Sequence, residues 1–136
     1  MLEKLKWDNS LSVKVKQLDD QHKSLITIIN LLQEAITDHR QEEALSEIIS
    51  NLKEYAIHHF ESEEKLFTQF NFKFNKEHKK EHNDFKIILD GYTSRMKTSP
   101  VAVSEELLIF LKAWLINHIF TSDRKYISLF KAKGLT

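Results

Sequence analysis

Residues 42–67 read EEALSEIISNLKEYAIHHFESEEKLF, and apolar side chains recur every three or four positions through the first half of the stretch. This spacing places them on one face of an α-helix. Glu42 and Glu43 suit its first turn, because the helix dipole favours negative charge there. Further along, the same face reaches His59 and Glu63, where a core helix would normally carry leucines. The stretch therefore predicts a long helix whose buried face changes from apolar to polar.

Three other segments repeat the helical spacing, and the chain of 136 residues contains only two Gly and one Pro. Hairpins and βα turns usually need more of both. The predicted helices span about 19–38, 42–67, 75–97 and 104–120. The expected N-caps are Asp19 or Asp20 for the first, Asn75 for the third and Ser104 for the fourth. Short connections between them predict an all-α, antiparallel up-down-up-down four-helix bundle, a single domain over 1–136, with an N-terminal arm and a short C-terminal helix.

The composition limits the classes of function. The 20 basic and 20 acidic residues balance, and neither sign is segregated, so we expect no nucleic-acid partner. The absence of Cys excludes thiolate zinc sites, iron–sulfur clusters and thiol catalysis. No stretch approaches the roughly 18 apolar residues of a membrane span, and the N-terminus lacks the apolar core of a signal peptide. We therefore expect a cytoplasmic protein with no membrane partner.

Polar residues also interrupt the buried faces of the other predicted helices. Together with His59 and Glu63, the residues in such positions are His22, His78, His82 and His118. Residues on antiparallel neighbouring helices lie at one height when they are equidistant from the connecting turn. The pairs His22–His59, His59–His82, Glu63–His78 and His82–His118 are all centred on predicted turns. At a rise of about 1.5 Å per residue, these side chains meet at one level of the bundle.

Asp123 joins this cluster by a different argument. It lies five residues after His118, off the ideal helical face, but near the predicted helix end, where the chain can turn a carboxylate inward. His39, in a turn, and His58, about 100° from His59 around the helix, are assigned to the surface. Taken singly, the His pairs at i,i+4 are ordinary helical neighbours. Their common level and face favour a shared site, because buried imidazoles and carboxylates cost several kcal/mol unless they are paired or bind a metal.

Five imidazoles and two carboxylates exceed the four ligands of a structural zinc ion and suit first-row metals such as iron, manganese or zinc. We therefore predict two ions. Two octahedral ions offer about twelve positions, and these side chains fill all but one if both carboxylates and a solvent oxygen bridge. His22 and His59 form a two-His set, whereas His78, His82 and His118 form a three-His set. The ion held by two His should keep the open position, which suits a small diatomic ligand.

Five segments carry distinctive motifs. They are Trp7-Asp8, LDDQHKSL at residues 18–25, HFESEE at 59–64, HKKEH at 78–82, and WLINHI at 114–119 with Asp123 and Tyr126. As a set, and in this order, they resemble the hemerythrin family, specifically its single-domain bacteriohemerythrins, over nearly the whole chain. The sequence departs from the family where Lys14 replaces a common Gly, Phe67 a common Met, and Asn71-Phe72-Lys73 a Gly-Tyr-Pro. We expect Phe67 to alter the shape of the ligand pocket.

The resemblance implies two iron ions, Fe2+ or Fe3+, with a bridging oxo or hydroxo group. By this resemblance Glu63 and Asp123 bridge the irons, the three-His set completes one iron, and His22 and His59 hold the iron that binds O2. The implied function is reversible O2 binding for storage, transport or delivery, without enzymatic turnover. Nitric oxide is a further diatomic ligand to consider.

Two alternatives stay open at this point. One is oxygen or redox sensing through a partner protein, and the other is a di-iron oxidase or peroxidase. Oxygen-activating bundles of the ferritin-like type use about four carboxylates with two His. The ratio of five His to two carboxylates in this chain favours holding O2 over cleaving it.

Overall fold

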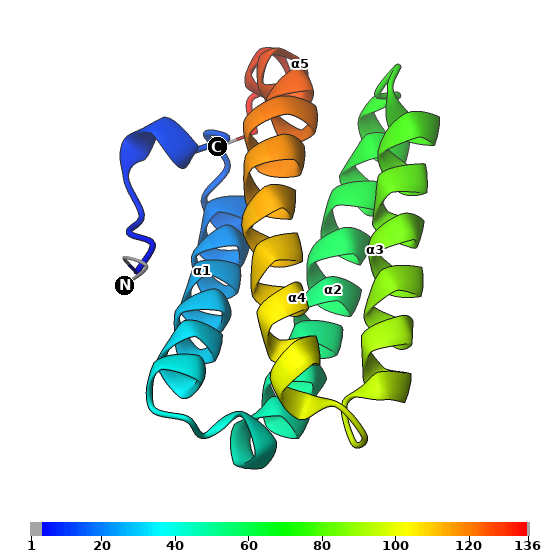
Figure 1. Cartoon of the computed structure of the whole chain (residues 1–136). Coiled ribbons are helices and arrows are strands. Elements are labelled where there is room, and N and C mark those ends of the chain that lie inside the picture. Colours follow the sequence, from blue (N-terminus) through cyan, green and yellow to red (C-terminus); the bar gives the residue numbers. More distant parts are fainter. Residues whose placement is uncertain (1–3, 136) are drawn as a thin grey trace.

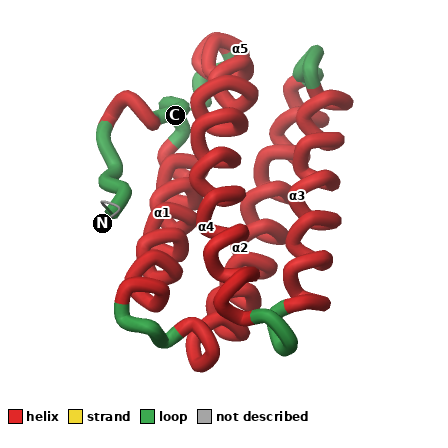
Figure 2. The backbone as a smooth tube through the Cα atoms, in the orientation of Figure 1, coloured by secondary structure: helices red, strands yellow, loops and turns green. Residues whose placement is uncertain are grey.

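The computed structural model of the chain describes residues 4–135, which form a bundle of long antiparallel helices (Figure 1). The helices are α1 (Lys16–Thr37), α2 (Gln41–Phe70), α3 (Asn75–Arg95) and α4 (Pro100–Trp114). Within residues 4–135 there is no strand, and short loops join the helices at the two ends of the bundle (Figure 2). The all-α four-helix prediction is confirmed. The predicted domain ends at 1 and 136 lie outside the described residues.

The start of α1 differs from the predicted N-cap. The helix begins at Lys16, after an extended Val15, so Asp19 lies in the first turn instead of before it. The Asp19 carboxylate accepts hydrogen bonds from the Val13 backbone N–H at 2.8 Å and from the Ser12 hydroxyl at 2.6 Å. An acidic side chain in this turn still interacts favourably with the helix dipole, while its hydrogen bonds fix the chain that leads into the helix.

The other two predicted N-caps are also wrong. Asn75 is the first residue of α3, which follows Phe74, and it makes no capping bond. Ser104 lies inside α4, where its hydroxyl donates to the Pro100 carbonyl at 2.7 Å. α4 begins at Pro100 because proline is compatible with a first helical position, where the backbone N–H has no helical partner. Asn75 and Ser104 therefore do not act as N-caps, although Asn and Ser favour that position, because each helix begins before the residue could cap it.

Two of the departures from the family motifs occupy left-handed backbone. Lys14 has φ of 65°, and Asn71, which follows the last residue of α2, has φ of 56°. Glycine is favoured in this region because it has no Cβ. Asn is the next most common residue after a helix C-terminus, so Asn71 replaces a glycine at little cost. Lys14 is held instead by its neighbours, since its N–H donates to the Ser12 hydroxyl at 3.0 Å.

The last helix does not end near residue 120 as predicted. After α4 the chain continues as the π-helix η2 (Leu115–Ser122), the 3₁₀ turn η3 (Asp123–Tyr126) and α5 (Ile127–Ala132), and these elements form one column in Figure 1. The Asp123 N–H bonds to the His118 carbonyl, which is the i→i+5 bond of a π-helix. Because a π-helical turn is wider than an α-helical one, Asp123 lies on nearly the same face as His118, five residues earlier.

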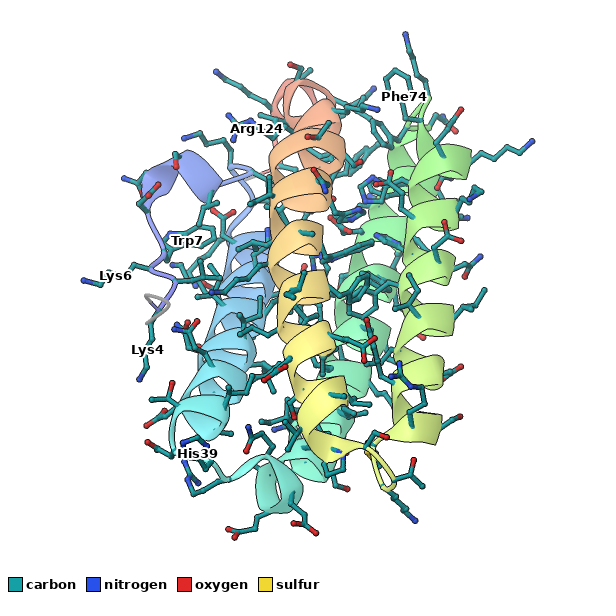
Figure 3. All side chains as sticks on the ribbon, viewed as in Figure 1. Lys4, Lys6, Trp7, His39, Phe74 and Arg124 are labelled. Atoms are coloured by element: carbon teal, nitrogen blue, oxygen red, sulfur yellow. The ribbon has the colours of Figure 1, made fainter. Side chains whose placement is uncertain are left out.

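The N-terminal arm lies along the outside of α1 (Figure 1). It contains the short 3₁₀ turn η1 (Asn9–Leu11). The Leu5 N–H donates to the Asn30 side chain, whose amide donates back to the Leu5 carbonyl, both at 2.8 Å. Arg124, labelled in Figure 3, donates to the Ser10 carbonyl at 2.9 Å. The predicted arm is therefore attached both to α1 and to the C-terminal column.

Buried apolar side chains form two clusters. The larger includes Leu25, Ile29, Leu32, Ile49, Leu52, Phe60, Phe85, Leu89, Leu107, Leu111, Leu115 and Ile119. The smaller contains Val13, Val15, Leu18, Phe67, Phe72, Tyr126 and Phe130. In α1, His22 lies between Leu18 of the smaller cluster and Leu25 of the larger, and in α2, Glu63 lies between Phe60 of the larger and Phe67 of the smaller.

Within the described chain, no helix combines the length and the hydropathy that crossing a bilayer requires.

Candidate metal centre

The predicted polar cluster exists and lies between the two apolar clusters. Its members are His22 of α1, His59 and Glu63 of α2, His78 and His82 of α3, His118 of η2, and Asp123 at the start of η3. At most 2% of each of these residues is exposed. His39 and His58 are exposed, as predicted, and Figure 3 shows His39 at the α1–α2 turn, away from the cluster.

The cluster divides into two groups of potential ligands. One group is Glu63, His78, His82 and His118, and the other is His22, His59, Glu63 and Asp123. In each group the donor atoms lie within 4.8 Å of one another. All five imidazoles direct Nε2 toward a carboxylate of the cluster. The two groups correspond to the three-His and two-His sets expected from the sequence.

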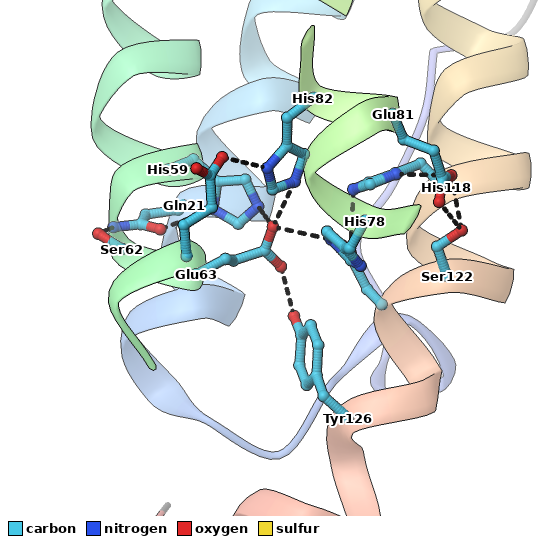
Figure 4. A network of polar contacts seen from close by, with 12 residues as sticks. Gln21, His59, Ser62, Glu63, His78, Glu81, His82, His118, Ser122 and Tyr126 are labelled. Carbon is cyan, nitrogen blue, oxygen red and sulfur yellow. Dashed lines mark hydrogen bonds and ion pairs between the residues drawn. The ribbon is translucent and has the colours of Figure 1, made fainter. Parts of the chain in front are cut away.

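Glu63 belongs to both groups. Its Oε1 lies 3.0 Å from His82 Nε2 and 3.3 Å from the Nε2 atoms of His59 and His78. Its Oε2 accepts a hydrogen bond from the Tyr126 hydroxyl at 2.7 Å (Figure 4). Tyr126 therefore fixes the rotation of the carboxyl group and leaves Oε1 facing the imidazoles.

Asp123 also lies between the two sets. Oδ1 is 2.9 Å from His78 Nε2 and 3.0 Å from His118 Nε2, whereas Oδ2 is 3.0 Å from His22 Nε2. The sequence predicted that the chain would turn this carboxylate inward beyond the helix end. The structure gives a different cause, because the helix continues and its π-turn places residue i+5 on the inner face.

The inward-facing atoms fit metal ions better than they fit one another. Among the described residues, His82 Nε2, His118 Nε2 and both Asp123 oxygens are buried at ion-pair distances within the cluster but make no hydrogen bond of good geometry. His22 Nε2 and His59 Nε2 lie 3.0 Å apart. Leaving a buried donor or acceptor unsatisfied costs about 1–3 kcal/mol per group. Nitrogen and oxygen donors without sulfur suit first-row metals, which would satisfy these lone pairs together.

A second layer of polar residues lies behind the imidazoles. His118 Nδ1 is 3.1 Å from Glu81 Oε1 and His59 Nδ1 is 2.6 Å from Gln21 Oε1 (Figure 4). His82 Nδ1 is 2.8 Å from Glu64 Oε2. The sequence analysis missed these roles. The available signal was their position, because each residue is adjacent in sequence to a cluster member and so lies about 100° from it around the helix.

Aromatic rings cover the imidazoles. Phe60 stacks on His82 with 3.9 Å between ring centroids, and Trp114 stacks on His118 at 4.1 Å. Phe67 meets His78 edge-on at 4.7 Å. Such rings hold the imidazole planes by packing and exclude water from the cluster.

Burial and charge act in opposite directions on the imidazoles. Burial lowers the pKa of His78, but the Asp123 and Glu63 carboxylates outweigh it and raise that pKa to about 9. The pKa of His118 is likewise lowered by burial and raised, to about 10, chiefly by Asp123. Burial raises the pKa of Glu63, yet the imidazoles, His59 foremost, bring it well below its usual value. The metal-free chain therefore holds protons on His78 and His118, where metal ions would bind.

Loading the metal-free chain with Zn2+ at pH 8 is expected to release one proton each from His78 and His118. Both pKa values lie above pH 8, and only a neutral imidazole binds a metal. The affinity should therefore increase as the pH rises toward 9. Conversely, stability that the two protonated imidazoles give the metal-free chain is fully present below pH 6.5 and is lost as the pH passes about 9 to 10.

Calorimetry in buffers of different ionisation enthalpy measures the number of protons released. His78→Gln should reduce it by one, whereas His58→Gln, a substitution at the surface, should leave it unchanged. Zinc binding without proton release would contradict the assignment.

Comparison with known proteins places these residues in a family. Residues 13–130 match the hemerythrin HHE cation binding domain. A bacteriohemerythrin from Pseudomonas paraeruginosa is 33% identical over 123 residues, covering 90% of this chain and 79% of the relative. A hemerythrin-like protein from Naegleria gruberi is 35% identical over 120 residues, 88% of each chain. A myohemerythrin from Theromyzon tessulatum is 32% identical over 124 residues, covering 91% of this chain and 92% of the relative. Because the domain match spans residues 13–130 and relatives at 32–35% identity cover most of the chain, the chain belongs to the hemerythrin family.

Proposed function

We propose that this chain holds two iron ions and binds O2 reversibly, for storage, transport or delivery. The proposed iron ligands are His22, His59, Glu63, His78, His82, His118 and Asp123. The observation that carries the proposal is the pair of buried four-residue groups that share Glu63, each with donor atoms within 4.8 Å of one another. The unsatisfied nitrogen and oxygen atoms of these groups support occupation by metal ions.

The proposed ligands divide unequally between the two irons. His78, His82 and His118 would hold one ion and His22 and His59 the other, while the Glu63 and Asp123 carboxylates lie close to both sets. An ion held by two imidazoles would have fewer protein ligands, so the open position for O2 would belong to that ion. Nitric oxide is a second diatomic ligand that this position would suit.

The donor set favours binding O2 over breaking it. When bound, the two irons, with a bridging oxo or hydroxo group, supply the electrons that O2 takes up and returns. Five neutral imidazoles with two carboxylates bring less negative charge than the four-carboxylate sites of oxygen-activating bundles. Lower negative charge gives less stabilisation to highly oxidised iron. We therefore propose a binding protein and not an enzyme.

The surrounding residues suit a small apolar ligand. Leu25, Leu115 and Ile119 are at most 5% exposed, belong with Phe60 to the larger apolar cluster, and each lies within a helical turn of a member of the polar cluster. These side chains exclude water and polar substrates. Tyr126 donates to Glu63 Oε2 and keeps that oxygen from rotating toward the imidazoles. The chain thus supplies a dry, rigid setting in which O2 can bind and leave.

The test is an absorption titration of the ferrous-loaded chain. We expect two irons per chain by metal analysis and a visible band that develops in air and disappears when O2 is removed. A chain that holds fewer than two irons, or that develops no band, would contradict the proposal. Steady consumption of O2 in the presence of a reductant would favour an oxidase instead.

A further inference from the structure

The residues behind the imidazoles differ in charge between the two sets. In the three-His set, His82 and His118 each direct Nδ1 at a carboxylate, from Glu64 and Glu81 respectively. In the two-His set, His59 directs Nδ1 at the neutral amide of Gln21. Among the described residues, the Nδ1 of His22 is buried without a hydrogen-bond partner. On the Nδ1 side of the imidazoles, therefore, carboxylates contact the three-His set and no carboxylate contacts the two-His set among the described residues.

The hydrogen bonds around Gln21 fix which atom faces His59. The Ser62 hydroxyl donates to the His58 carbonyl at 2.7 Å, so its oxygen is free to accept from the Gln21 Nε2, 3.0 Å away. The other amide atom, Oε1, must then face His59 Nδ1. His59 Nδ1 donates the hydrogen bond, and its Nε2 faces the cluster as a lone pair.

Glu81 is held with similar firmness. The Ser122 hydroxyl lies 2.6 Å from Glu81 Oε1 and 2.8 Å from Oε2 (Figure 4). Its carboxylate is therefore kept behind His118, although about a third of the side chain is exposed. Glu64, on α2, reaches across to His82 on α3 at 2.8 Å. Both contacts join different helices, so the carboxylates are positioned by the fold.

We propose that Glu64 and Glu81 make the iron of the three-His set the first to be oxidised, and that Gln21 makes the iron of the two-His set the last. This inference rests on the proposed di-iron function. A carboxylate that accepts from Nδ1–H makes the imidazole a stronger donor, and a stronger donor stabilises Fe3+ relative to Fe2+. A neutral amide oxygen that accepts from Nδ1–H strengthens the imidazole as a donor less than a carboxylate does. The three residues are positioning residues that act through the imidazoles.

The electron count is simple. Each step transfers one electron between an electrode and one iron, and the Nδ1 proton stays between the imidazole and its acceptor. The chain should therefore show two one-electron couples. The lower-potential couple belongs to the three-His set and the higher-potential couple to the two-His set.

The test is spectroelectrochemistry of the iron-loaded protein, with its iron content and helicity measured for every variant. Glu64→Gln and Glu81→Gln should each raise the lower couple by about 59 mV, which is a tenfold change in a one-electron equilibrium. The higher couple should move less, so the separation narrows. Gln21→Glu should instead lower the higher couple, which narrows the separation while the mean potential falls.

Glu61→Gln is the matched control, because Glu61 is exposed on α2 and makes the same change of charge. It should leave both couples in place. If every variant shifted both potentials equally, the effect would come from long-range charge alone, and the inference would be overturned. A single unresolved two-electron wave would also overturn it. If the unmodified chain holds two irons and binds O2, these outcomes overturn the inference but not the proposed function. If the unmodified chain does not hold two irons, the proposed function and the inference both fail.

Discussion

Asp123→Asn is expected to leave a folded bundle that holds at most one iron. The carboxylate reaches His78 and His118 through Oδ1 and His22 through Oδ2. Asn keeps the shape of the side chain, but its neutral amide nitrogen cannot replace a carboxylate oxygen as a metal ligand. The variant therefore loses the bridge between the sets. The metal-free fold should suffer less, because His78 and His118 can each lose the proton that Asp123 stabilises.

The effect is measured by iron analysis and by urea unfolding with iron and with a chelator. At a thousandfold excess over its Kd, each bound ion stabilises the fold by about 4 kcal/mol. The variant should lose at least that much of the difference between the two conditions. Asp84→Asn, the same change at an exposed residue, is the control. Two irons and an unchanged difference in the Asp123 variant would show that this carboxylate is not a ligand.

Phe67→Ala is expected to cost about 3–5 kcal/mol of unfolding free energy, both with and without metal. The ring is fully buried, and its centroid lies 4.7 Å from those of Phe72 and His78 and 5.4 Å from that of Tyr126. Removing it leaves a cavity beneath the tyrosine that holds Glu63. The loss in the metal-free chain distinguishes this variant from Asp123→Asn, and urea unfolding under the same two conditions measures it.

Phe67→Met is the matched variant, because it nearly conserves volume and restores the residue common in the family. It should cost less than about 1.5 kcal/mol. The sequence analysis expected Phe67 to shape the ligand pocket. In the described part of the chain, the Phe67 ring contacts the rings of His78, Phe72, Tyr126 and Phe130, and it contacts neither His22 nor His59. We therefore expect Phe67→Met to change the O2 affinity little. A large change would indicate that O2 binds near His78, on the side of the three-His set.

The common level of the polar cluster was predictable because it depends on the rise per residue, which is nearly constant in α-helices. In an antiparallel pair, equal distance from a turn fixes equal height whatever the side chains are. His22 meets His59 for this reason, and Glu63 meets His78. Short loops leave little freedom to shift the helices along one another. The convergence therefore required only the positions of the turns.

The helix ends and the residues behind the imidazoles were less predictable. Asn75 and Ser104 are good caps by propensity, but propensity is weak and the preceding residues decided where each helix began. Glu64 and Glu81 lie off the buried face and look like ordinary surface charges until neighbouring helices are placed. Gln21 is polar and adjacent to His22, which gives no hint that it contacts His59. Such contacts depend on rotamers across helices.

The π-helix of Leu115–Ser122 links the N-terminal arm and the C-terminal column to the polar cluster. If this segment tightened into an α-helix, Asp123 would swing by roughly a quarter turn and leave the centre. Arg124, the next residue, would swing with it and release the Ser10 carbonyl. A single backbone turn therefore sets two things at once, the inward direction of a carboxylate and the reach of the guanidinium that secures the N-terminal arm.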